Sequence, residues 1–210
     1  MTASDQPVWH TNIQTADSAE TDPVVYPTRA YFTGTGNLDE IADLTEEQHI
    51  QAVAAHELGH FLVQWQQGAW MHSIAIRKGT GAQVIPAGVT AFAYPDGNHD
   101  RHIIIGGAAG ERACDRWLHE ENLWTTARAV YGEIQGLTDR QDACQIDPSI
   151  TFDGGPNDYR HFQDEADRAL GQVWPLLRSG LAHFTNYAEY TGDQMCQLLG
   201  ISNNPKNGTR

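Results

Sequence analysis

The sequence is poor in cysteine, in basic residues and in long hydrophobic runs, and each shortage excludes a class of protein. Its three cysteines, Cys114, Cys144 and Cys196, are odd in number and lack CxxC spacing. Neither a disulfide framework nor a thiolate metal site is therefore expected. Lysine and arginine number 13 against 27 aspartates and glutamates, and the resulting net charge of −14 repels phosphate backbones and anionic lipids. We expect no nucleic-acid partner and no membrane partner.

No stretch of 18 apolar residues occurs, and the opening residues MTASDQPVWHTNIQ lack the basic start and apolar core of a secretion signal. These absences predict a soluble, cytoplasmic protein. A chain of 210 residues suits one globular domain. We expect residues 1–40 to form an N-terminal arm, partly disordered or with one short strand. Residues 41–201 are expected to form the domain, and 202–210 a frayed tail.

The segment from Thr45 to Trp65 has the pattern of one long helix. Thr45 followed by Gln48 is a capping box, and Gly68 is a natural stop. Between them, apolar residues recur at helical spacing: Ile50, Val53, Ala54, Leu58, Phe61, Leu62 and Trp65.

Beyond this helix the pattern changes to short strands over 72–77, 83–85 and 89–94. Asp100 then caps a second helix, whose Gly106, Gly107 and Gly110 would destabilise it unless another backbone, most simply that of the first helix, approached closely. A helix over 123–134 precedes a polar loop, helical patterning resumes at Asn157, and Pro175 is expected to start a further helix. The fold class predicted is α+β, mainly helical with a small β-sheet.

The motif HELGH in the first helix carries the chemistry. His56 and His60 stand one turn apart, so both imidazoles can reach one zinc ion, while Glu57 can activate a water bound to it. This is the H-E-x-x-H arrangement of zinc peptidases. A shuffled chain of this composition would contain it about 2% of the time. The plainer interpretation is a helix that happens to carry polar residues, but apolar neighbours would make unpartnered imidazoles costly here.

A catalytic zinc site needs a third protein ligand, with the fourth position left for water. The extension HExxHxxGxxH is absent, because residues 64–67 contain no histidine. Glu111 on the second helix and Asp158 after the GGP sequence are both candidates. Spacing alone does not decide between them.

Four motifs in order resemble the peptidase domain of the membrane-anchored AAA+ zinc proteases of the FtsH type. They are HELGHFLV at His56, SIAIRKG with GVT in the strand region, IGGAAGE in the second helix, and GGPND ending at Asp158. The resemblance covers about residues 45–200. It implies an HExxH zinc-peptidase domain with Zn²⁺ held by His56, His60 and Asp158, and with Glu57 as the general base. Glu111 would then be a buried helix residue near the site.

The resemblance also implies a polypeptide substrate aligned with an edge strand within residues 83–93. Two features of that family are missing, since the sequence contains no Walker A motif and no transmembrane segment. The span between the IGGAAGE and GGPND motifs is also longer, with an insertion around 118–150.

The function predicted is that of a zinc metalloendopeptidase that hydrolyses short or unfolded polypeptides, with a separate unfoldase as a partner for folded substrates. Two alternatives stay open. One is a stand-alone regulatory protease that cleaves a single repressor. The other is a zinc-containing peptide-binding module without catalysis, against which the presence of Glu57 argues.

Overall fold

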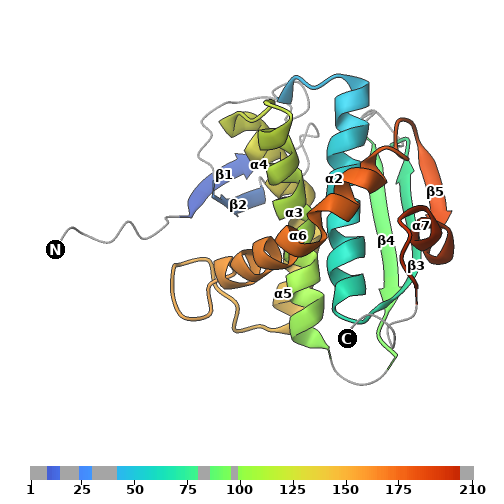
Figure 1. Cartoon of the computed structure of the whole chain (residues 1–210). Coiled ribbons are helices and arrows are strands. Elements are labelled where there is room, and N and C mark those ends of the chain that lie inside the picture. Colours follow the sequence, from blue (N-terminus) through green and yellow to red (C-terminus); the bar gives the residue numbers. More distant parts are fainter. Residues whose placement is uncertain (1–8, 15–23, 30–41, 80–85, 96–98, 204–210) are drawn as a thin grey trace.

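The computed structural model describes residues 9–14, 24–29, 42–79, 86–95 and 99–203 (Figure 1). Within them the elements follow in the order β1 (His10–Gln14), β2 (Val24–Thr28), α2 (Glu46–Gln66), β3 (Trp70–Arg77), β4 (Ala87–Ala93), α3 (Asp100–Glu120), α4 (Thr126–Gln135), α5 (Leu137–Ile146), α6 (Arg160–Leu181), β5 (Ala188–Thr191) and α7 (Gly192–Leu198).

The strands form two separate antiparallel groups. β1 pairs with β2 as a hairpin, and a second sheet has the strand order β4-β3-β5. In this second sheet Ile74 pairs with Thr90 of β4 on one side and with Tyr190 of β5 on the other. β4 is therefore an edge strand of the sheet.

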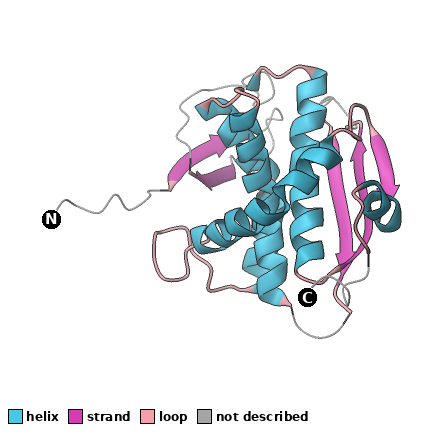
Figure 2. Ribbon diagram, in the orientation of Figure 1, coloured by secondary structure: helices cyan, strands magenta, loops and turns pink. Residues whose placement is uncertain are grey.

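Helix α2 lies in the middle of the molecule, between the three-stranded sheet and α3 (Figure 1). α6 crosses both helices, and α2 is the long helix that packs against the sheet, with α3 and α6 on its other side (Figure 2). This arrangement is the α+β fold class expected from the sequence, mainly helical with a small sheet.

The predicted α2 helix is confirmed, including the way it starts. The hydroxyl of Thr45 accepts a hydrogen bond from the Gln48 amide at 3.2 Å, and the Gln48 side chain accepts one from the Thr45 amide at 2.9 Å. Each bond satisfies an amide that a helix start would otherwise leave without a partner. The helix ends before Gly68, whose φ of 95° suits glycine.

The glycine-rich α3 packs closely against α2, as predicted. A Cβ on Gly59 of α2 would lie 2.5 Å from the carbonyl oxygen of Ala109. From the α3 side, a Cβ on Gly106 would lie 1.8 Å from the side chain of Gln64. The missing side chains let the two helices approach, and this burial compensates for the low helix propensity of glycine.

Other expectations change. Asp100 is the first residue of α3, and the capping position before it, His99, makes no side-chain capping bond. The predicted polar loop after residue 134 contains α5, so much of the supposed insertion is helical. Pro175 lies inside α6, which runs on from Arg160 to Leu181. The expected strand at 83–85 lies outside the described residues, as do most of the N-terminal arm and 204–210 of the tail.

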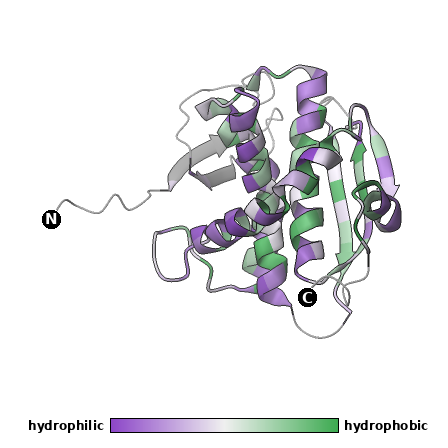
Figure 3. Ribbon diagram, in the orientation of Figure 1, coloured by the Kyte–Doolittle hydropathy of each residue, from purple (hydrophilic) through white to green (hydrophobic). Residues whose placement is uncertain are grey.

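Hydrophobic residues are concentrated on the sheet and on the middle turns of α2 and α3, whereas the first half of α6 is hydrophilic (Figure 3). Ala54, Ala55, Leu58, Phe61 and Leu62 of α2 are fully buried. No helix in the described part of the chain is long and apolar enough to cross a membrane.

Candidate metal centre

The two histidines of HELGH meet on the buried middle of α2. Their Nε2 atoms are 2.9 Å apart, and the two rings are nearly perpendicular. Both residues are buried, as is the intervening Glu57. His56, Glu57 and His60 each offer a possible ligand atom, and these atoms lie within 4.8 Å of one another. The structure thus brings the three residues of the predicted motif together.

Helix α3 supplies the wall against which the histidines pack. A Cβ on Gly110 would lie 2.5 Å from the Nε2 of His60 and 2.7 Å from the Nε2 of His56. One turn earlier, the carbonyl oxygen of Gly106 lies 2.7 Å from the Nδ1 of His60. In the neutral form of the ring, which is the form that binds a metal, the Nδ1 proton is donated to this carbonyl and Nε2 keeps its lone pair. The Nδ1 of His56 is buried without a hydrogen-bond partner among the described residues.

Asp139, in the first turn of α5, completes the cluster. Its Oδ2 lies 3.3 Å from the Nε2 of His56 and 3.4 Å from that of His60. Burial alone would lower the pKa of His60, but the charge and hydrogen bond of Asp139 raise it to about 10. Burial would raise the pKa of Asp139, yet the two histidines hold it below its usual range. Without a metal, these side chains therefore form a buried ion pair.

Glu57 is held from the sheet side by strand β4. The Thr90 hydroxyl donates to Glu57 Oε2 at 2.7 Å and lies 3.1 Å from the Glu57 carbonyl oxygen. Two residues earlier, Gly88 lies directly against the same carboxylate, because a Cβ there would be 2.3 Å from Oε1. Residues 88 and 90 face α2 together, as alternate residues of a strand must.

A cavity of about 170 Å³ opens beside His60 and Asp139. Its volume is close to that of an engineered apolar cavity of about 150 Å³ that holds a benzene ring. It is therefore large enough for one amino-acid side chain. Its remaining lining comes from α2, α3, α5 and β4: Gln64, Thr90, Phe92, Ile103, Ile104, Gly107, Asp142, Ala143 and Ile146.

The structure does not bring Asp158, the expected third ligand, to the histidine pair. Its Oδ2 accepts hydrogen bonds from the Trp9 indole at 2.8 Å and from the Gly154 amide at 2.6 Å. Its Oδ1 accepts from the Arg160 amide at 2.9 Å, and Asp158 does not line the cavity beside His60. Both carboxylate oxygens thus close the loop that leads into α6.

The alternative ligand, Glu111, is also engaged elsewhere. It is buried, as the resemblance implies, and its Oε2 accepts from the Arg140 guanidinium at 2.6 and 3.0 Å. Its Oε1 accepts from the Gln163 side chain at 2.5 Å. Asp139, which the sequence argument did not single out, is the acidic residue that lies against both histidines.

Comparisons with protein-family models, with curated proteins and with solved structures find no match for this chain.

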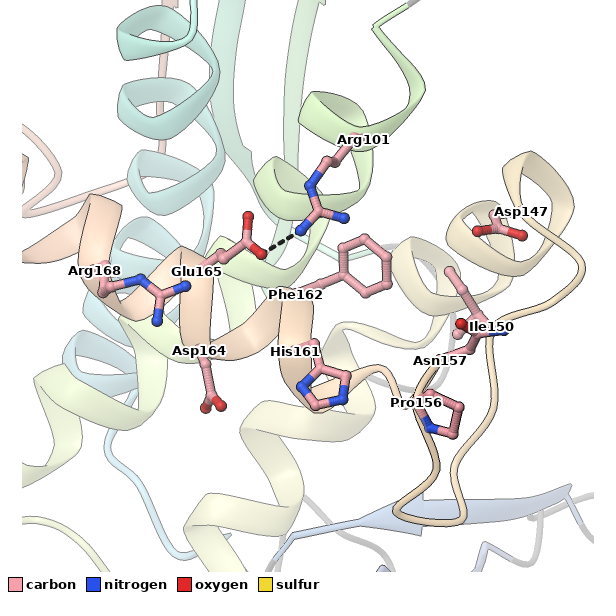
Figure 4. A pocket seen from close by; sticks show the side chains of 10 residues that line it. All are labelled: Arg101, Asp147, Ile150, Pro156, Asn157, His161, Phe162, Asp164, Glu165 and Arg168. Carbon is pink, nitrogen blue, oxygen red and sulfur yellow. Dashed lines mark hydrogen bonds and ion pairs between the residues drawn. The ribbon is translucent and has the colours of Figure 1, made fainter.

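A different cavity, of about 410 Å³, lies between the start of α3, the end of α5 and the first turns of α6 (Figure 4). An ion pair between Arg101 and Glu165 crosses one side of it, and the Arg101 guanidinium lies 5.2 Å from the ring centre of Phe162. None of the histidine cluster lines this cavity. Its lining residues are Arg101, Asp147, Ile150, Pro156, Asn157, His161, Phe162, Asp164, Glu165 and Arg168.

Proposed function

We propose that this protein is a zinc metallopeptidase in which His56, His60 and Asp139 hold the metal. The observation that carries the proposal is the triangle formed by the two Nε2 atoms and the Asp139 oxygen, with sides of 2.9, 3.3 and 3.4 Å. Nitrogen and oxygen ligands at 2.0–2.1 Å from a tetrahedral zinc ion stand about 3.3 Å apart. The donor set therefore suits zinc in both chemistry and spacing.

Three protein ligands leave one position open for a water or a substrate, as in catalytic zinc sites. Zinc bound here would lower the pKa of a water and polarise a peptide carbonyl. Glu57 accepts the proton of the attacking water and passes it to the leaving amine. The hydrogen bond from Thr90 holds the Glu57 carboxylate in one orientation during this transfer.

The substrate we propose is an extended polypeptide paired with the outer edge of β4. Only one side of β4 is hydrogen-bonded to another described strand, and the strand passes over Glu57. Backbone hydrogen bonds to such an edge align a peptide without selecting its sequence. The cavity beside His60 then receives a side chain next to the bond that is cut, and its isoleucines and Phe92 favour an apolar one.

Short or unfolded polypeptides meet these requirements, because a strand-like substrate must be free of its own fold. The sequence contains no phosphate-binding loop of the Walker type. For folded proteins, which do not offer a free strand, we propose an unfoldase as a partner.

The first test replaces the base and keeps the ligands. Glu57→Gln should retain one zinc per chain and lose hydrolysis of quenched fluorescent peptides, since an amide does not accept the proton of the water. Full activity in this variant would contradict the role of Glu57. Zinc binding by the wild type without hydrolysis of any member of a broad peptide library would instead support the non-catalytic binding module.

A second test separates the two candidate ligands. Asp139→Asn should weaken zinc binding strongly, whereas Asp158→Asn should leave it within a few-fold of the wild type while lowering thermal stability. Each substitution removes one carboxylate charge, so they are matched controls for each other. Loss of zinc in the Asp158 variant alone would return the ligand role to Asp158.

A further inference from the structure

Directly after Asp139, helix α5 carries Arg140, whose charge is buried among charged partners. Only 3% of Arg140 is exposed. Its guanidinium donates to Glu111 of α3 at 2.6 and 3.0 Å and to Glu133 of α4 at 2.8 Å. A further donor reaches the backbone carbonyl of Pro27 in β2. One side chain thus ties α5 to three other elements.

The partners of Arg140 are themselves fixed by the N-terminal hairpin and by α6. The Glu133 carboxylate accepts from the Arg29 amide at 2.9 and 3.0 Å, and Glu111 accepts from Gln163. Burial raises the pKa of Glu133, and the Arg140 charge opposes this shift. A buried carboxylate that lost this partner would be left with a large desolvation penalty.

The indole of Trp9 adds a contact from the start of the chain. Its ring centre lies 5.3 Å from the Arg140 guanidinium and 4.6 Å from that of Arg160. Its Nε1 donates to Asp158. Trp9 thus joins the loop before α6 to the buried ion cluster, so the segment before β1 contributes to the surroundings of α5.

Consecutive residues of an α-helix project about 100° apart, so fixing one of them fixes the direction of the next. Arg140 points to Glu111 and Glu133 while Asp139 points to the two histidines. On the α3 side, Gly107 faces Asp139, and a Cβ added there would make only an ordinary contact of 3.6 Å with the Cβ of Asp139, so the bonds of Arg140 are what fix the direction of α5. A rotation of α5 that broke the Arg140 bonds would carry the Asp139 carboxylate away from the histidines.

We propose that Arg140 is a positioning residue for the metal centre. Through its bonds to Glu111, Glu133 and the β2 backbone, it holds α5 in the orientation that presents Asp139 to His56 and His60. The inference rests on the proposed zinc site. In this inference the N-terminal hairpin and Trp9 help to hold α5, and with it the third ligand Asp139, in place.

The test compares Arg140 with Arg128, because each side chain donates several hydrogen bonds to other parts of the fold. Arg140→Lys keeps the charge and loses the planar fork, which a single ammonium group does not replace. Arg128→Lys is the matched control, because Arg128 donates to the carbonyl oxygens of Ala42, Asp43 and Leu123 and has no bond to α5. Zinc affinity is measured on the full chain by competition with a chromophoric chelator, and the thermal midpoint is recorded in parallel.

We expect Arg140→Lys to weaken zinc binding about 10- to 100-fold, the range found when groups that orient metal ligands are removed. Arg128→Lys should leave the affinity within about 2-fold even if it lowers the thermal midpoint as much. Substitution of cobalt gives a second readout, since loss of one ligand changes the intensity of its visible absorption. Unchanged affinity and an unchanged cobalt spectrum in Arg140→Lys would overturn the inference.

A double-mutant cycle shows whether Arg140 acts through Asp139. In an Asp139→Ala background, Arg140→Lys should cause little further loss of zinc affinity, because the ligand that it positions is gone. Equal losses in the two backgrounds would overturn the inference. If Arg140→Lys does not fold, Trp9→Ala takes its place in the same cycle, with a smaller expected loss of a few-fold.

The outcome for the wild-type chain separates this inference from the proposed function. A wild type that binds zinc tightly, together with an Arg140→Lys variant that binds it equally well, contradicts the positioning role alone. A wild type that binds no zinc contradicts the metal centre, and the role of Arg140 fails with it.

Discussion

Replacement of Gly88 by alanine tests whether strand β4 fixes the position of Glu57, the proposed general base. A Cβ at this position would lie 2.3 Å from Oε1 of Glu57, and ordinary contact begins at 3.4 Å. In Gly88→Ala the carboxylate must therefore move by 3.4 − 2.3 = 1.1 Å. The three atoms in the way, Oε1, Cγ and Cδ, all belong to the Glu57 side chain, so we expect this side chain to move and the strand backbone to stay.

A displacement of about 1 Å in a catalytic group can reduce the rate about 100-fold. That corresponds to about 2.7 kcal/mol of transition-state stabilisation at 1.36 kcal/mol per factor of ten. Zinc should stay bound, because the two histidines and Asp139 are not the atoms that the new methyl group meets. The expected variant is folded and metal-loaded but has about 1% of the wild-type kcat/KM.

Hydrolysis of a quenched fluorescent peptide gives kcat/KM, elemental analysis gives the zinc content, and thermal unfolding gives stability. Gly171→Ala is the control, because nothing lies within 4 Å of its added Cβ in the middle of α6. It should gain about 0.5–1 kcal/mol of stability and keep full activity. Wild-type activity in Gly88→Ala would refute the placement of Glu57 under β4, and loss of zinc would refute the separation of base from ligands.

Three further outcomes follow from the same geometry. Gly110→Ala should abolish tight zinc binding while the helical circular dichroism stays, because its Cβ would lie 2.5 and 2.7 Å from the two Nε2 atoms; a variant that still binds one zinc tightly would contradict the close packing of α3. In the metal-free protein, His60 has a pKa raised to about 10 and Asp139 has a pKa below its ordinary value of 3.8. Their ion pair therefore stabilises the fold fully between about pH 4 and pH 6.5, progressively less toward pH 10, and also less in stronger acid. Zinc must displace the proton on His60, so its apparent affinity should increase about tenfold per pH unit between pH 6.5 and pH 10. Calorimetry in buffers of different ionisation enthalpy should detect about one proton released near pH 7. A zinc affinity that does not depend on pH would contradict the ion pair. For the thiols, burial raises the pKa of Cys114 to about 12, whereas Cys144 is partly exposed, so alkylation of the native protein at pH 8 should modify Cys144 first by peptide mapping.

The sequence was sufficient to predict the part of the site that lies on one helix. The boundaries of α2 follow from Thr45, Gln48 and Gly68, all of which act locally. The closeness of α3 could also be predicted, since the glycines of a helix need a compensating contact. Both predictions depend on interactions within a few residues or on a composition with a single physical explanation.

The acidic residue beside the histidines could not be predicted in the same way. Asp139 lies 79 residues beyond His60, in a polar segment that carries no motif and that the sequence argument assigned to a loop. Its nearness to the histidines comes from the packing of α5 on α3, which depends on Arg140 and its distant partners. Asp158 was predicted as the ligand because it stands in a recognisable motif, yet in the structure its carboxylate accepts hydrogen bonds from the backbone of its own loop.

The contact between Thr90 and Glu57 was partly within reach of the sequence. A strand over residues 89–94 was predicted, and a threonine two residues after a glycine shares its face. The sequence could not predict the level of β4, meaning which residues of the strand lie beside which turn of α2. That level is set by the pairing of Ile74 with Thr90, a tertiary register that no local pattern encodes.

The glycines of α3 limit how this protein can be engineered for heat resistance. Exchange of helical glycine for alanine is among the commonest routes to a more robust enzyme. Here that route is closed at Gly106 and Gly110, where the added methyl group would clash with Gln64 or the imidazoles. It stays open at Gly171, where nothing lies within 4 Å of the added Cβ. Substitutions that raise the thermal stability of this protein will therefore have to be made in other helices, such as α6, while α3 keeps its glycines.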